Sequence, residues 1–295
     1  MAMRALWGVV FVLLVAGFAP AGHAQERFSI FVPSEQANVE RMLTLAGVRD
    51  DDVIVDLGSG DGRIVLTAAK LNRKVRGFGV DLDQKLVDQA NAAAKAQGVA
   101  DRVQFFHRNA FDADLSGVTI IAMWMWPEIQ RMLRTKILAE ARPGTRVITN
   151  IWDMGSWTPD HADSDGPTVN LWVVPAKVEG NWTWELPLGG TRKAFHAVKE
   201  QRFQRLEGVA RIDGRRGVFT DYKLQGEAIS FTLGMTVEGI GYVRHEFSGK
   251  VQGDRMEGTA RITLPPDHDK PVTVPWRATR VPASGWFAPT GVDAK

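Results

Sequence analysis

The stretch VIVDLGSGDGRIVLTAAK, residues 53–70, joins an apolar run to a helix-like run through a turn that contains three glycines. A short apolar run that ends at glycine is typical of a buried strand. Gly58 and Gly60 carry no side chain that would keep a ligand away from the backbone, and Gly62 allows the start of the helix to pack against the strand. The stretch therefore predicts a strand, a ligand-binding turn and a helix.

Strand-like and helix-like segments alternate on both sides of this unit. Helices are predicted over residues 34–48, 63–72, 84–98 and 127–144, and strands over 52–57, 75–82, 101–110, 118–126 and 145–152. Uninterrupted alternation is typical of an α/β fold with a parallel, doubly wound sheet. Such sheets bind ligands beyond the carboxyl ends of their strands, which is where the glycine turn falls.

The second half of the chain has a different pattern. Residues 169–176 and 181–188 are expected to supply the last strands of the first sheet, which gives a first domain over 28–188. Residues 189–285 alternate apolar with polar side chains between glycine turns, and this predicts a small antiparallel barrel or sandwich. Substrate presentation, a structural cap and dimer formation all remain open as its role, and the oligomeric state is not fixed.

The amino-terminal residues 1–24 have the pattern of an export signal. Arg4 precedes an apolar stretch from Leu6 to Ala19, and small residues follow up to Ala24. The stretch is short for a bilayer span, which needs about 20 residues. We expect export to the periplasm with cleavage near Ala24 and no transmembrane segment afterwards; an uncleaved membrane anchor is the alternative.

Composition excludes several classes of function. The formal net charge is only +2, from 36 basic and 34 acidic residues, and the sequence has no long basic run, so nucleic acid is not an expected partner. Cysteine is absent, which excludes disulfides, thiolate catalysis and cysteine metal ligands. No metal site is expected.

The spacing of the glycines bears on the kind of ligand. A dinucleotide fingerprint needs a third glycine at position 63, where the chain has Arg63. Asp56 precedes the turn and Asp61 lies within it, and these carboxylates favour a cationic ligand over a phosphate. An NAD-type dehydrogenase is therefore disfavoured.

The frame D-x-G-x-G-x-G, which begins at Asp56, resembles motif I of the class I S-adenosylmethionine-dependent methyltransferases, whose ligand carries an ammonium and a sulfonium. Segments 31–48, 55–70 and 123–137 are also similar to the small class I methyltransferases that include the mitochondrial lysine methyltransferases acting on ATP synthase and adenine nucleotide translocase. The resemblance covers roughly residues 28–160. It implies S-adenosylmethionine as cofactor and says less about the substrate.

The resemblance implies contacts with the cofactor from Asp56, Gly58, Ser59, Gly60, Gly62, Asp81, Asn109 and Ala110. Asp81 ends the second strand, where a carboxylate can accept both ribose hydroxyls. We expect it to have no structural role, and Asp83 is the competing candidate. Asn109 falls where the family usually has G-D-A, so the contact with the adenine amino group departs from the family pattern.

The methyl acceptor is expected to be a protein lysine or another amine. The fourth strand lacks the N-P-P-Y that holds a nucleobase or a glutamine amide, and tryptophans at or beyond the ends of the fourth and fifth strands could line an aromatic channel for an alkylammonium. These are Trp124, Trp126, Trp152 and Trp157. Core packing is the alternative for all four.

No catalytic residue is assigned by the sequence. Trp126, Glu128 and Asp153 are the candidates, with His161 as a further possible base. A different class of function also stays open, in which an exported, non-catalytic module keeps the S-adenosylmethionine fold while its β domain binds a partner.

Overall fold

The computed structural model describes residues 32–266 and 270–285. The expected export signal, up to Ala24, lies outside the described residues. Within these two ranges, no helix combines the length and the apolar character needed to cross a bilayer.

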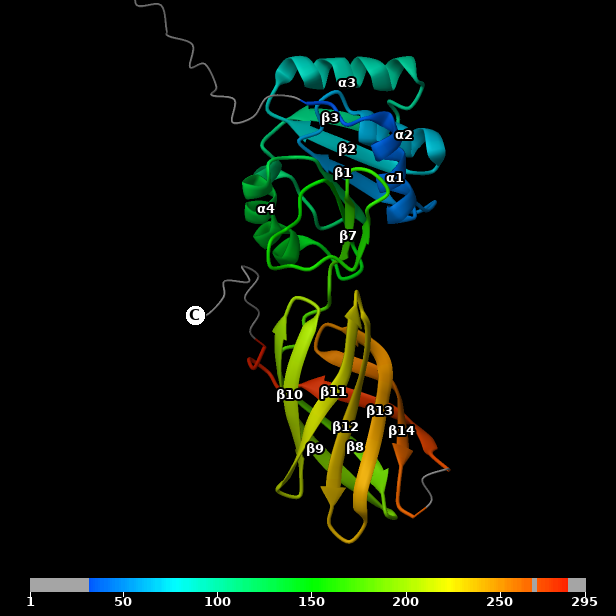
Figure 1. Ribbon diagram of the computed structural model, residues 1–295, viewed down its shortest axis with the longest axis vertical. Helices are drawn as coiled ribbons and strands as arrows, with labels where there is room; N and C mark the ends of the chain where they lie inside the picture. The colour runs from blue at the N-terminus through cyan, green and yellow to red at the C-terminus, as the bar shows by residue number, and fades with distance from the viewer. Residues whose placement is uncertain (1–31, 267–269, 286–295) are drawn as a thin grey trace, which may run out of the picture. The chain divides into compact units, whose positions relative to one another are not determined.

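The first half of the described chain forms a seven-stranded sheet in the order β3-β2-β1-β4-β5-β7-β6 (Figure 1). Its strands are β1 (Val53–Leu57), β2 (Arg76–Asp81), β3 (Val103–His107), β4 (Ile120–Met123), β5 (Arg146–Asn150), β6 (His161–Asp163) and β7 (Val169–Val173). Strands β1 to β5 are parallel, whereas β7 is antiparallel to β5 and to β6. The strand order reverses between β1 and β4, and this places the glycine turn at a ligand-binding switch point.

Both faces of this sheet are covered. The helices are α1 (Gln36–Ala46), α2 (Arg63–Leu71), α3 (Gln84–Ala96) and α4 (Pro127–Glu140), with a short 3-10 helix η1 (Ala110–Asp112). Ile54 joins a core cluster with α1, α2 and α3, whereas the next residue, Val55, joins the cluster that contains α4. Because successive strand residues are buried on opposite faces, β1 is apolar at every position except Asp56. The predicted α/β fold is confirmed.

The second half is a closed antiparallel barrel of eight strands. These are β8 (Gly180–Leu188), β9 (Thr191–Arg202), β10 (Arg205–Ile212), β11 (Arg215–Gln225), β12 (Ala228–Val237), β13 (Gly241–Gln252), β14 (Arg255–Thr263) and β15 (Val272–Arg280). Each strand pairs with the next, and β15 closes the barrel on β8. The expectation that residues 181–188 complete the first sheet is therefore wrong. A two-residue turn joins β8 to β9, and the alternating burial of β8 suits a barrel wall.

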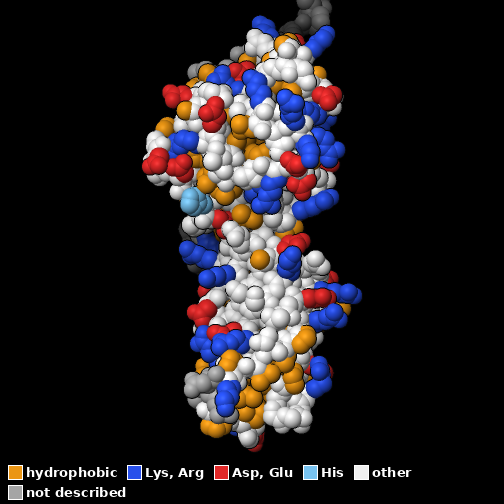
Figure 2. All heavy atoms as spheres, turned by 90° about the vertical axis from the view of Figure 1, so that its right-hand side faces the viewer, with side chains coloured by type: hydrophobic (Ala, Val, Ile, Leu, Met, Phe, Trp, Pro, Cys, Tyr) orange, Lys and Arg blue, Asp and Glu red, His pale blue; other side chains and the backbone are white. Residues whose placement is uncertain are grey.

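The surface carries charges of both signs. On the face drawn in Figure 2, lysine and arginine side chains lie among aspartate and glutamate side chains. Some of these charges are paired in each domain: Lys74 Nζ lies 2.7 Å from Asp50 Oδ2, and Arg192 Nε lies 3.0 Å from Glu185 Oε2. Exposed pairs of this kind contribute at most about 1 kcal/mol each, so the hydrophobic cores stabilise the fold far more than these charges do.

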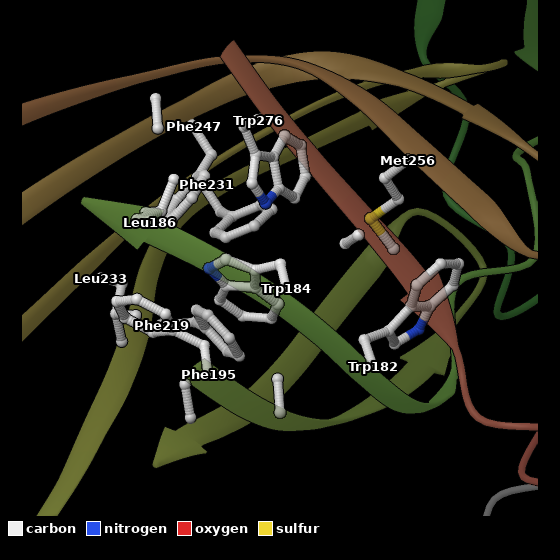
Figure 3. Packing of buried hydrophobic residues seen from close by; sticks show 14 of the residues in the cluster. Trp182, Trp184, Leu186, Phe195, Phe219, Phe231, Leu233, Phe247, Met256 and Trp276 are labelled. Atoms are coloured by element: carbon white, nitrogen blue, oxygen red, sulfur yellow. The ribbon is translucent and has the colours of Figure 1, made fainter. Parts of the chain in front are cut away.

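Aromatic side chains fill the barrel (Figure 3). Trp184 stacks on Phe195, with ring centroids 5.2 Å apart and planes 9° apart, and meets Trp276 edge-on at 6.3 Å. Phe231 packs against Trp276 at 5.6 Å. Eight strands enclose a space that side chains of this size can fill, so the barrel has its own hydrophobic core.

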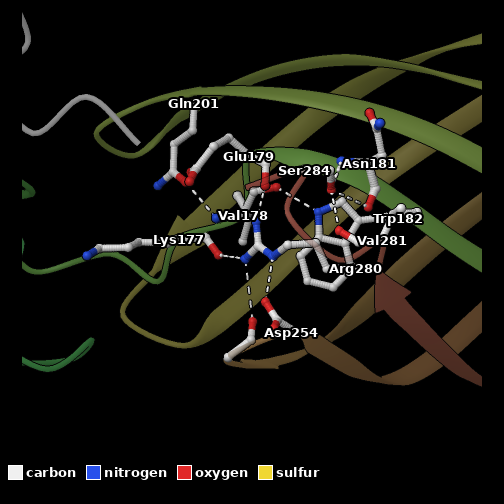
Figure 4. Close-up of polar contacts among 11 residues, drawn as sticks. Lys177, Val178, Glu179, Asn181, Trp182, Gln201, Asp254, Arg280, Val281 and Ser284 are labelled. Carbon is white, nitrogen blue, oxygen red and sulfur yellow. Dashed lines mark hydrogen bonds and ion pairs between the residues drawn. The ribbon is translucent and has the colours of Figure 1, made fainter. Parts of the chain in front are cut away.

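Arg280 fastens the last strand of the barrel to the segment before the first (Figure 4). Its guanidinium lies 4.5 Å from the ring centroid of Trp182, and its Nε donates to Asp254 Oδ1 at 2.8 Å. The same guanidinium donates to the backbone carbonyls of Lys177 and Glu179. A side chain that is nearly buried thus has its charge and its donors satisfied at once.

Candidate functional site

The turn after β1 requires glycine at three positions. Gly58, Gly60 and Gly62 have φ values of 85°, 52° and 81°, in the left-handed region that other residues avoid. A Cβ on Gly62 would lie 2.5 Å from the ring of Phe105, and one on Gly58 would lie 3.0 Å from the Met125 side chain. Gly62 thus allows a close approach to Phe105 of β3, whereas the expected approach was to the strand that precedes the turn.

Asp81 holds this turn against the end of β2. Its Oδ2 accepts a hydrogen bond from the Gly60 nitrogen and its Oδ1 accepts one from the Asp83 nitrogen, each at 2.8 Å. The Asp83 carboxylate in turn caps α3 by accepting from the Lys85 nitrogen at 3.0 Å. The expectation that Asp81 has no structural role is therefore wrong. Its carboxylate nevertheless lies at the carboxyl edge of β2, where the ribose contact is expected.

Asp56 is a buried carboxylate beneath the turn. Only 2% of the residue is exposed, and its Oδ1 has no hydrogen-bond partner among the described residues. Burial, and then the nearby charges of Asp81 and Asp61, raise the pKa of Asp56 to about 8. The buried Oγ of Ser59 has no partner in the described chain either. A buried carboxyl group and a buried hydroxyl group with unpaired oxygens suit a ligand that brings positive charge and hydrogen-bond donors.

Asp61, unlike Asp56, has a partner for its carboxylate within the chain. Its carboxylate binds the Arg63 guanidinium, with Oδ2 2.5 Å from Nη2, and Arg63 also donates to the Ser34 carbonyl. Although partial burial acts in the opposite direction, hydrogen bonds and charge from Arg63 leave the pKa of Asp61 below its ordinary value. The Asp61 carboxylate is thus already paired within the chain, which leaves Asp56 and Asp81 to face a ligand at this turn, and Asp56 becomes charged there only when a cation lowers its raised pKa.

Asn109 and Ala110 follow β3 at the same edge of the sheet. Asn109 precedes η1, and its Oδ1 accepts a hydrogen bond from the Phe111 nitrogen at 3.0 Å. The amide oxygen thus holds the local turn. A contact with an adenine amino group at this position would have to share that oxygen.

The four tryptophans do not form one channel. Trp126 is 50% exposed and Trp152 is 40% exposed, beyond the ends of β4 and β5. Trp124 is half-buried. Trp157 is completely buried, with its ring 6.0 Å from that of Trp172, so its expected place in a channel is wrong and the core-packing alternative holds for it.

The polar candidates near these tryptophans are exposed. Glu128 lies in the first turn of α4, where a carboxylate complements the helix dipole. Asp153 accepts from the Gly155 nitrogen at 2.9 Å and lies 3.5 Å from Arg131 Nη2. His161 begins the edge strand β6. These contacts give none of the three a catalytic role.

One buried polar residue at this edge, Asn150, was not predicted from the sequence. It is the last residue of β5 and is 1% exposed, and within the described residues neither atom of its side-chain amide has a hydrogen-bond partner. The signal that could have found it is its place: a polar residue that ends an apolar strand at the ligand-binding edge of the sheet.

Comparisons with known proteins agree with this geometry. Residues 56–161 match the profile of the ANTKMT methyltransferase domain. A protein-lysine N-methyltransferase from Saccharolobus islandicus is 36% identical over 149 residues, which cover 49% of this chain and 92% of that protein. The adenine nucleotide translocase lysine N-methyltransferase of Mus musculus is 29% identical over 150 residues, which cover 51% of this chain and 64% of that protein.

Among solved structures, an RNA methyltransferase from Salinibacter ruber in complex with S-adenosyl-L-homocysteine is 42% identical. The match covers 50% of this chain and 96% of that one, with a TM-score of 0.48.

The sheet, its glycine turn, the match to the family profile and the match to the Saccharolobus islandicus enzyme define a class I S-adenosylmethionine-dependent methyltransferase. Within that class, the chain belongs to the lysine-methyltransferase-like family that carries the ANTKMT methyltransferase domain. Nothing in the comparisons supports the alternative of a non-catalytic module.

S-adenosylmethionine is the cofactor of this family, and the residues present fit it. Its ammonium and sulfonium carry the positive charge that the carboxylates of Asp56 and Asp81 can accept. The three glycines open the backbone of the turn to a ligand. When bound, the cofactor supplies an activated methyl group, and the protein has to orient the acceptor and exclude water.

Proposed function

We propose that this protein methylates the ε-amine of a lysine in another protein, with a different primary amine as the alternative acceptor. The observation that carries the proposal is the match to a protein-lysine N-methyltransferase over 92% of that relative's length. Residues 56–161, which match the family profile, contain the glycine turn and the carboxyl ends of β1 to β5. Asp81 would accept the ribose hydroxyls, and Asp56 would face the positive charge of the cofactor.

The surface beyond β4 and β5 supports an amine as acceptor. Only an uncharged amine has the lone pair needed to attack a methyl group, so the site has to favour loss of the lysine proton. Trp126 and Trp152 present exposed aromatic surface at the ends of these neighbouring strands. Aromatic faces attract an alkylammonium, and an apolar surround lowers its pKa as it becomes buried.

The test is transfer of a radioactive methyl group from S-adenosylmethionine to an extract of the organism that makes the protein. We expect the full-length protein to label protein bands, and acid hydrolysis of these bands to release methylated lysine. Acetylation of the extract beforehand converts its lysine amines into amides, whose nitrogen cannot attack a methyl group, and should abolish the labelling. Gly60→Val, which places a branched side chain at a left-handed position of the turn, is the inactive control.

Two results would overturn the proposal. The first is failure of the wild-type protein to bind S-adenosylmethionine or its demethylated product. The second is label that enters only the RNA of the extract and survives the blocking of its lysines.

A further inference from the structure

The register of the sheet places Asp56 and Asn150 on the same face. Asp56 pairs with Ala122 across β1 and β4, and Ala122 pairs with Ile148 across β4 and β5. Asn150 follows Ile148 by two residues, so its side chain points to the same side of the sheet. Two strand spacings, roughly 10 Å, separate β1 from β5. Two buried polar side chains with unpartnered atoms thus lie along one edge.

The amide of Asn150 differs from a structural amide elsewhere in the same domain. Asn91 donates to the Phe105 carbonyl at 2.8 Å and accepts from the Phe105 nitrogen at 3.0 Å, which satisfies both ends of its side chain. In the described part of the protein, neither Nδ2 nor Oδ1 of Asn150 has such a partner. Burying a polar group without a hydrogen-bond partner is destabilising, so an amide in this state calls for a bound partner.

The chain after Asn150 makes a strained turn. Ile151 has φ 68°, a conformation that is unfavourable for a β-branched residue, and the Trp152 nitrogen donates to the Asn150 carbonyl at 2.8 Å. The Ile151 nitrogen donates to the Thr168 carbonyl at 2.7 Å, which fixes the turn from the side. Strain of this kind gathers at functional sites. Here it leaves Ile151 42% exposed and Trp152 40% exposed directly beside the buried amide.

The order of the strands indicates which ligand would meet Asn150. The expected adenine and ribose contacts, Asn109 and Asp81, follow β3 and end β2, and the glycine turn follows β1. The cofactor would therefore run along the edge from β3 towards β1. Strand β5 lies beyond β4, on the far side of β1 from the adenosine. The adenosine is thus not the group expected at Asn150, which leaves the methyl acceptor and the methionine end of the cofactor, and titration with S-adenosylhomocysteine alone separates these two.

We propose that Asn150 binds the acceptor amine, with Oδ1 accepting a hydrogen bond from the uncharged ε-nitrogen of the lysine. This inference rests on the proposed function. The lysine nitrogen uses its lone pair to form the new N–C bond while the S–C bond breaks and its electron pair returns to sulfur. The product is a methylated ammonium, which later releases a proton to water. A neutral amide orients the amine without favouring its charged form, as a carboxylate would.

The direct test is the carbon NMR signal of the Asn150 side-chain carbonyl in the full-length protein. Asparagine is labelled selectively with ¹³C, the protein is saturated with S-adenosylhomocysteine, and the signal is assigned by its loss in Asn150→Ala or Asn150→Asp. N-acetyl-lysine methylamide is then added near the pKa of a free lysine, about 10.4, where much of its amine is uncharged. We expect the signal to move with the lysine derivative. Movement with S-adenosylhomocysteine alone, or no movement with the lysine derivative, would overturn the inference.

Kinetics on the same lysine derivative give a second readout. Asn150→Ala should lower kcat/KM for the acceptor by about tenfold or more, because one hydrogen bond is lost, while the Kd for S-adenosylhomocysteine stays unchanged. Asn150→Asp should move the pH profile of turnover to higher pH, because a carboxylate stabilises the ammonium. Asn170→Ala is the matched control. Asn170 of β7 is also buried, but its neighbours Val169 and Leu171 pack in the cluster that contains α1 to α3, so the Asn170 side chain points to the opposite face of the sheet. Unchanged kinetics in Asn150→Ala would contradict the inference, whereas loss of cofactor binding by the wild type would refute the proposed function itself.

Discussion

The Oδ2 atom of Asp81 accepts a 2.8 Å hydrogen bond from the backbone nitrogen of Gly60. This contact joins the end of β2 to the turn that follows β1, and those two strands are neighbours in the sheet. One carboxylate therefore shapes the turn and also lies where the ribose of the cofactor is expected. The stability of the turn and the affinity for the cofactor should change together when it is removed.

Asp81→Ala should weaken binding of S-adenosylhomocysteine by at least about tenfold, because a hydrogen bond to a charged group contributes about 1.5–3 kcal/mol. It should also lower the free energy of unfolding without ligand, since Gly60 loses its acceptor. Calorimetric titration and urea denaturation measure the two effects. Asp83→Ala is the control: it removes the cap of α3, at a cost of about 1 kcal/mol, and should leave the affinity nearly unchanged. Equal losses of affinity in the two variants would contradict this assignment.

Asp56 should make the stability of the unliganded protein fall as the pH rises. Its pKa is 3.8 in the unfolded chain and about 8 in the folded protein, because burial and two nearby carboxylates disfavour its ionised form. Its contribution is therefore fully present below the lower value and is lost as the pH approaches the higher one. Asp56→Asn should have a flatter curve of unfolding free energy against pH over this range. Parallel curves for the two proteins would show that Asp56 ionises normally.

Trp126 and Trp157 should respond in opposite ways to replacement by alanine. Trp126 is 50% exposed, so Trp126→Ala should reduce turnover with the acceptor while the melting temperature barely changes. Trp157 is completely buried, so Trp157→Ala should destabilise the protein by about 3–5 kcal/mol through the cavity it leaves. Thermal melts and methyl-transfer assays on both variants distinguish the roles. A large fall in melting temperature for Trp126→Ala would place that residue in the core instead.

Lys199 should make the stability of the barrel rise with pH. Its Nζ is buried 3.8 Å from the ring centroid of Phe231 and 4.0 Å from that of Phe219. Burial lowers the pKa of Lys199 from 10.5 to about 7, so between these values the unfolded chain binds a proton that the folded barrel does not. Stability should therefore be lost as the pH falls from the upper value to the lower one.

Lys199→Met tests this expectation, because it keeps a long side chain but has no charge. Its unfolding free energy should exceed that of the wild type near neutral pH, and the difference should shrink as the solution becomes alkaline. Lys193→Met is the control on the same strand, since Lys193 is paired with Asp213 at 2.5 Å. A constant difference between Lys199→Met and the wild type would contradict the expected titration.

Residues 1–30 should direct a passenger protein out of the cytoplasm. The prediction rests on Arg4, the apolar stretch from Leu6 to Ala19 and the small residues before Ala24. A reporter that is active only outside the cytoplasm, fused after residue 30, should become active in a bacterial host. Leu13→Arg places a charge within the apolar stretch and should silence it. A reporter that stays inactive with the natural sequence would contradict export.

The parts of the fold that depend on residue periodicity could be predicted from the sequence. The alternation of apolar strands with amphipathic helices predicted the parallel part of the sheet, and the glycine spacing predicted the turn after β1. The placement of β8 could not be predicted in the same way. A period of two indicates a strand but does not say which sheet the strand joins, and residues 181–188 pair with β9 and β15.

The candidate site was predictable at the level of strand ends and not at the level of hydrogen bonds. Asp81 was found by its position, but the backbone nitrogens that it accepts from leave no signal in the sequence. The sequence does not distinguish Trp126, which is exposed, from Trp157, which is buried. Both lie in loops, where the alternation of side chains along a strand no longer fixes their direction. Asn150 was not predicted, because the lack of hydrogen-bond partners for its buried side-chain amide is evident only in three dimensions.

Closure of the barrel sets an order on its folding. Arg280 reaches the backbone of Glu179, 101 positions earlier in the chain, and β15 pairs with β8. During synthesis, β8 is made first but keeps an open edge until the last strand has been made. Contacts between such distant segments form slowly, and open strand edges invite pairing with other chains. Until β15 has been made and paired with β8, the barrel therefore has an open strand edge that can pair with another copy of the protein.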